Sequence, residues 1–80
     1  MDADALKDQV IRPKLAEVFG DLLAGSIVTR AMLAALQGQN EEERKRLIIE
    51  AVCAHERVLA MWGAARAAKQ KNEWLQQCQG

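Results

Sequence analysis

The chain has few of the residues on which enzymes and disulfide-bonded scaffolds depend. Its 80 residues include two cysteines, one histidine and no tyrosine, and Ser26 and Thr29 are its only hydroxyl side chains. Two cysteines, Cys53 and Cys78, are too few for the disulfide framework of a small secreted domain. The sequence contains no nucleophile beside a base, no glycine-rich phosphate loop and no dinucleotide fingerprint. We therefore predict a protein that is not an enzyme and that uses no cofactor.

An excess of charge of either sign is also missing. The 11 acidic residues balance the 11 basic ones, whereas nucleic-acid-binding domains are usually basic. The opening residues, MDADALKDQV, are acidic and polar, unlike a signal peptide. No uncharged apolar run reaches the roughly 18 residues of a membrane span. We expect a cytoplasmic protein with reduced thiols, no membrane contact and nucleic acid only as a disfavoured partner.

Helix-forming residues dominate what remains. Only SIVT, residues 26–29, resembles a strand, and it is too short to stand alone. The sequence predicts one all-α domain, residues 1–80. We expect a small bundle in which two or three short N-terminal helices, within residues 1–37, pack on one long C-terminal helix, residues 41–78.

Capping residues and breakers divide the N-terminal half. Asp2 or Asp4 is expected to cap the first helix. Pro13 either kinks this helix or lies in the first turn of a new one. Ser26 is expected to cap a second helix that ends near Gln37.

The segment QGQN, residues 37–40, is the clearest boundary in the sequence. Gly38 suits a helix end, and Asn40 suits a helix start. Glu43 follows Asn40 at the spacing of a capping box.

The stretch from Leu47 to Ala68 is apolar on almost every side of the expected long helix. Alternating spacings of four and three define a predicted packing seam that is rich in alanine: Leu47, Ala51, Ala54, Val58, Met61, Ala65, Ala68 and Leu75. Bulkier side chains define a second buried face: Ile48, Val52, His55, Leu59 and Trp62.

A helix that is apolar all round is usually buried all round, and one short chain covers only one side of it. We therefore predict an intertwined homodimer, parallel or antiparallel, in which a second chain covers the seam. Alternatively, the alanines are exposed residues that serve only as good helix formers.

His55 is a candidate metal ligand, but the spacing is unfavourable. Cys53 lies two residues away, and side chains with this spacing diverge on a helix. We expect no metal site, and we interpret His55 as a core or interface histidine bonded to a carboxylate or a carbonyl.

Near the C-terminus, basic residues accompany an aromatic one. Arg66, Lys69, Lys71 and Trp74 are candidate contacts with a partner. The alternative is a solvated basic face with Trp74 packed inside the protein.

The surplus of apolar helix surface predicts a protein–protein interaction module that acts as an adaptor, an assembly factor or an inhibitor. The length of the chain also suits a small inhibitor of phage or mobile-element origin. The protein partner is not identifiable from the sequence. The alternative is a DNA-binding regulator, because residues 22–37 loosely suggest a helix-turn-helix with Thr29, Arg30 and Gln37 on its reading helix.

Overall fold

The computed structural model describes residues 2–79, and its regular elements in that range are all helical. They form five helices, the first of which contains a π-helical segment. The prediction of a small all-α fold is therefore confirmed. In chain order the elements are α1 (Ala3–Leu6), η1 (Lys7–Ile11), α2 (Arg12–Phe19), α3 (Asp21–Ala35), α4 (Glu41–Ala54), α5 (Glu56–Trp62) and α6 (Ala64–Gln79).

The chain passes Pro13 without a break. Proline has no N–H and its ring crowds the carbonyl four residues earlier, so a regular helix is strained there. The structure places η1 directly before α2, and the N–H of Arg12 donates to the carbonyl of Lys7, five residues back. A local π-helical turn thus leads from α1 into α2, and Pro13 lies in the first turn of α2, which is one of the two predicted alternatives.

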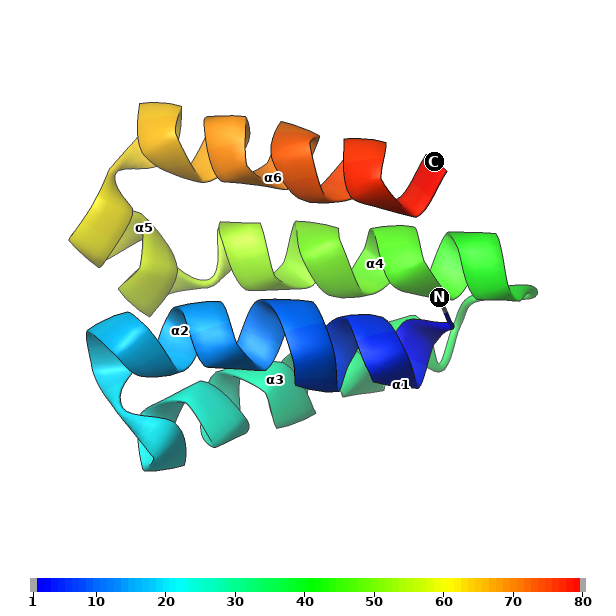
Figure 1. Ribbon diagram of the computed structural model, residues 1–80, viewed down its shortest axis with the longest axis horizontal. Helices are drawn as coiled ribbons and strands as arrows, with labels where there is room; N and C mark the ends of the chain where they lie inside the picture. The colour runs from blue at the N-terminus through cyan, green and yellow to red at the C-terminus, as the bar shows by residue number, and fades with distance from the viewer. Residues whose placement is uncertain (1, 80) are drawn as a thin grey trace.

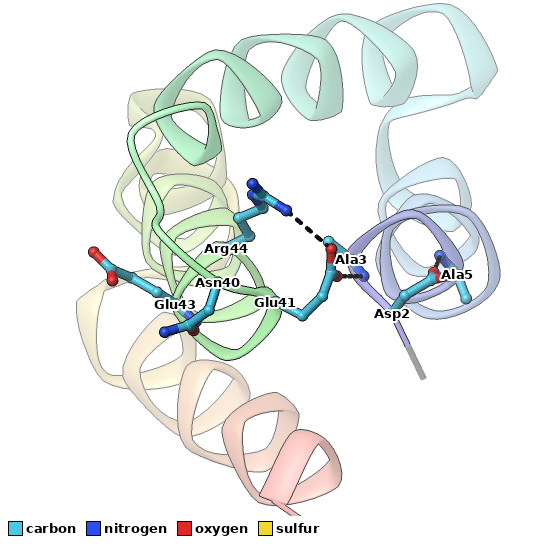
Figure 2. Close-up of polar contacts among 7 residues, drawn as sticks. All are labelled: Asp2, Ala3, Ala5, Asn40, Glu41, Glu43 and Arg44. Carbon is cyan, nitrogen blue, oxygen red and sulfur yellow. Dashed lines mark hydrogen bonds and ion pairs between the residues drawn. The ribbon is translucent and has the colours of Figure 1, made fainter.

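Side-chain hydrogen bonds cap the starts of α1 and α4 and link these two helix starts to each other (Figure 2). Asp2 Oδ1 accepts a hydrogen bond from the N–H of Ala5 at 2.8 Å, and Asn40 Oδ1 accepts one from Glu43 at 2.9 Å. Both predicted caps are confirmed. Glu41 reaches across the bundle, where its Oε2 accepts from the N–H of Ala3 at 2.9 Å. The N-terminus of α1 is therefore tied to a residue 38 positions away.

The corner before α3 lies at Gly20 and not at Ser26, where the second helix was expected to begin. Gly20 has φ +83° and ψ 166°, a region of the backbone map that is almost restricted to glycine. Helix α3 then runs unbroken from Asp21 to Ala35. Ser26 lies inside this helix and does not cap it. The helix-turn-helix suggested within residues 22–37 is therefore wrong, because the segment lacks the turn on which the DNA-binding alternative depended.

Helix α4 is the centre of the bundle (Figure 1). It packs against α3 on one side, against α6 on another, and against α1 near its own start. Its buried residues Ile48, Ile49 and Val52 are fully enclosed. Burial of such side chains contributes roughly 1.5–3 kcal/mol each, so α4 supplies much of the core.

The prediction of one long helix from residue 41 to residue 78 is wrong. The chain leaves the helix at His55, which is extended (φ −63°, ψ 134°), and again at Gly63 (φ +82°, ψ 159°). An unbroken helix would be on the order of 55 Å long, whereas the longest dimension of the molecule is 30 Å. The two corners fold α6 back along α4 (Figure 1). The apolar surface of α4 is thereby covered within one chain.

Candidate interaction surface

The outer side of α3 carries large apolar side chains in water. Leu22 is 94% exposed, Leu33 is 62% exposed and Leu36, at the C-terminal cap, is 76% exposed. With the exposed residues Ser26 and Thr29 between them, they follow one another at spacings of four, three, four and three. This spacing places all five on one stripe of the helix. We call Leu22, Ser26, Thr29, Leu33 and Leu36 the α3 outer row.

The opposite side of α3 explains why the row faces outward. Helix α3 packs against α2 and α4, and it lies at the edge of the bundle (Figure 1). Its buried residues are small or β-branched, which lets it approach those two helices closely: Ala24, Ile27, Val28, Ala31 and Ala35. The leucines follow a different stripe of the helix and therefore remain outside.

The exposure of this row is costly for an isolated chain. Single exposed leucines are ordinary, but here Leu33 and Leu36 are neighbours on one stripe, and Leu22 lies on the same stripe about three turns away. Covering the exposed parts of these three side chains would contribute about 3–7 kcal/mol, taking roughly 1.5–3 kcal/mol for a fully buried leucine. The row carries no charged side chain of its own, a feature of the centres of protein interfaces.

Two open grooves flank the row. One, of about 530 Å³, lies between α3 and the C-terminal part of α4. It is lined by small side chains with charged ones at its edge: Arg30, Ala31, Ala34, Ala51, Ala54, His55 and Glu56. The other, of about 400 Å³, lies toward η1 and α2 and includes Arg12, Gly25 and Thr29. The row therefore stands as a ridge between two depressions, a shape that suits an opposing helix.

The predicted seam is not one stripe, because its eight residues are divided among three helices. Val58 is fully buried within the chain, and Leu47, Ala51 and Leu75 are half-buried. Ala54, Met61, Ala65 and Ala68 are exposed. The breaks at His55 and Gly63 destroy the continuous heptad pattern on which the seam was based.

The five residues of the predicted second face lie on α4, on α5 and at the corner between them. Ile48, Val52 and Trp62 are buried, whereas Leu59 is 38% exposed. His55 is half-buried at the corner between α4 and α5, where its Nδ1 accepts a hydrogen bond from the N–H of Arg57 at 3.2 Å. It is thus the N-cap of α5 and not a core histidine bonded to a carboxylate or a carbonyl.

The four candidate partner contacts near the C-terminus are separated by the fold. Trp74 is 2% exposed, and its ring packs against Trp62 with centroids 6.3 Å apart. The guanidinium carbon of Arg66 lies 5.7 Å from the ring centroid of Trp62, a cation–π distance. Lys69 is exposed and Lys71 is half-buried. Trp74 is therefore a core residue, and the prediction of it as a contact surface is wrong.

The α3 outer row is not evident from the sequence when the second helix is expected to begin at Ser26. Leu22 is then separated from Leu33 and Leu36. The alternating spacing from residue 22 to residue 36 is visible in the sequence. It becomes informative only when Gly20, and not Ser26, is taken as the corner.

The two cysteines differ in their surroundings. Cys53 is 5% exposed, and burial raises the pKa of its thiol to about 11, with Lys71 opposing the shift. Cys78 is half-buried, and burial raises its pKa as well. Within residues 2–79 no group of three or more histidine, cysteine, aspartate or glutamate side chains is placed to hold a metal ion.

We expect an alkylating reagent at pH 8 to modify Cys78 first, and Cys53 at least about tenfold more slowly. A pKa near 11 leaves about 100-fold less thiolate than the ordinary value of 9.0, and the reagent reaches Cys53 only when the helices open. Mass spectrometry over time, with Cys78→Ser as the control, measures both rates. Equal rates for the two thiols would contradict the packing of α6 on α4.

Comparison of the chain with family models, with curated proteins and with solved structures found no match. Among residues 2–79, no helix is both long enough and apolar enough to cross a membrane.

Proposed function

We propose that this chain is a non-enzymatic interaction module that binds a helix of another protein chain through the α3 outer row. The observation that supports the proposal is the contrast between this row and the rest of the molecule. Ile48 on α4 and Trp74 on α6 are enclosed, while Leu22 is almost fully in water. Met61 and Leu59 on α5 are also exposed, at 56% and 38%, but only the outer row brings three exposed leucines onto one stripe, a feature typical of interaction surfaces.

The predicted homodimer is part of this proposal, but the surface through which the two chains pair is now α3 and not the C-terminal helix. The breaks at His55 and Gly63 remove the long C-terminal helix as the dimer surface, and the outer row offers a straight helix of 15 residues. An adaptor, an assembly factor or an inhibitor would act through the same surface. We retain a cytoplasmic location, which the two free cysteines suit.

Site-specific photo-cross-linking tests this proposal. A photoreactive residue at Leu33 is expected to give a defined cross-linked species in cells of the native source, and one at Gln76 on α6 is expected to give none. Gln76 is the matched control because it is also exposed, on a helix that packs on the far side of α4. The species should disappear when Leu36→Lys is added to the Leu33-labelled chain. Cross-linking at Leu33 that equals the Gln76 background, or that survives Leu36→Lys, would count against the proposal.

A further inference from the structure

The outer row of α3 is complementary to itself. Thr29 is its midpoint, with Leu22 seven residues before it and Leu36 seven residues after it. In an antiparallel pair whose two-fold axis passes Thr29, each Leu22 therefore lies level with Leu36 of the second copy. Both exposed ends of the row are covered at once, as a two-fold interface requires.

The same register provides space for the remaining leucine. Leu33 lies four residues after Thr29, so it is level with position 25 of the second copy, which is glycine, and next to Ser26. Gly25 also lines the groove toward η1 and α2. The guanidinium of Arg12 lies 3.4 Å from where a Cβ of Gly25 would be, so Leu33 would enter this groove beside Arg12. Moving the register by one turn in either direction places Leu36 or Leu22 beyond the end of the opposing α3.

Charge also favours the antiparallel arrangement. A parallel pair would bring the two Asp21 carboxylates together at one end, whereas an antiparallel pair separates them by roughly 24 Å. The helix dipoles oppose one another in the antiparallel pair, which is the favourable orientation. The two Arg30 residues approach one another in this pair, which opposes it, and Glu56 lines the groove on the same side.

From this geometry we infer that α3 pairs with α3 of a second copy, antiparallel, with the two-fold axis at Thr29. The inference rests on the proposed function and names its partner. One helix pair covers less than the roughly 1,200–2,000 Å² of a standard interface, so the dimer is weak, with a dissociation constant in the micromolar range or above.

Cysteine cross-linking tests the register. In a Cys78→Ser background, Thr29→Cys places two thiols at the axis, where helices at close contact bring Cα atoms within disulfide range. Ser26→Cys is the matched control, because its two copies lie about 9 Å apart along the axis, too far for a disulfide. Both positions are exposed, so both variants keep the fold, and circular dichroism checks this.

Under mild oxidation at about 100 μM, where a micromolar dissociation constant gives mostly dimer, we expect Thr29→Cys to form the disulfide-linked dimer at least tenfold faster than Ser26→Cys. Adding Leu33→Lys to the Thr29→Cys chain should lower its rate of disulfide formation to that of Ser26→Cys. Equal rates for the two variants would overturn the antiparallel register, and a Thr29→Cys chain that stays monomeric would overturn self-pairing. If Thr29→Cys stays monomeric but the Leu33 photo-cross-link joins the chain to a different protein, the proposed function stands without self-pairing. If Leu33 also gives no cross-link, both the self-pairing and the proposed function are overturned.

Discussion

Leu33→Lys is expected to weaken self-association about 30- to 1,000-fold. Leu33 occurs twice in a two-fold dimer, and covering the exposed 62% of one copy contributes about 1–2 kcal/mol. The loss of both copies, about 2–4 kcal/mol, corresponds to this change in the dissociation constant. The two lysines would lie about 12 Å apart along the helix axis and add a small repulsion. Dilution calorimetry of the parent and the variant measures the change.

Gln76→Lys is the matched control for this prediction. It adds the same charge at an exposed position on α6, a helix that packs on α4 and not beside the outer row. It should leave the dissociation constant within about twofold of the parent, as expected for a distant site. If Leu33→Lys and Gln76→Lys weaken association equally, net charge and not the outer row controls it.

Trp74→Ala is expected to lower the free energy of unfolding by about 3–5 kcal/mol. Among the α6 residues whose burial is described, Ala67 and Trp74 are buried, so the indole is the largest side chain that α6 contributes to the core, and it packs against Trp62 of α5. A domain of this size has only roughly 4–12 kcal/mol of stability in total. Urea titration followed by far-UV circular dichroism measures the loss.

Two further variants keep that prediction testable even if Trp74→Ala does not fold. Trp74→Phe retains an aromatic ring against Trp62 and should lose less stability than the alanine variant. Gln76→Ala, exposed on the same helix, should stay within about 0.5 kcal/mol of the parent. A Trp74→Ala chain as stable as Gln76→Ala would show that α6 is not anchored by this indole.

Local rules predicted the helical class and the helix starts, because caps act over three or four residues. Asn40 and Asp2 cap the helices that they were expected to cap. The effect of Pro13 was harder to predict. The π-helical turn at residues 7–11 accommodates the N–H that proline lacks and keeps the helix continuous, and this depends on the packing of the whole helix.

The corners at Gly20, His55 and Gly63 could not be predicted from propensity. A glycine inside a helical pattern costs only about 1 kcal/mol, so the pattern alone favours a continuous helix. The gain from folding α6 back onto α4 comes from contacts between residues 41–54 and residues 64–79, most of which lie too far apart in the sequence for a local window to contain them. The apolar surplus was recognised correctly, but it is covered by α6 of the same chain, and the uncovered stripe lies on α3.

Sedimentation equilibrium of the unmodified chain, from about 5 to 500 μM, is the most direct test of the pairing of two copies through α3, because it spans the dissociation constants expected of a weak dimer. We predict an average mass that rises with concentration from one chain toward two and stops there, since a two-fold pair covers both outer rows. A mass of one chain at every concentration would contradict the pairing, and so would a mass that continues to rise beyond two chains.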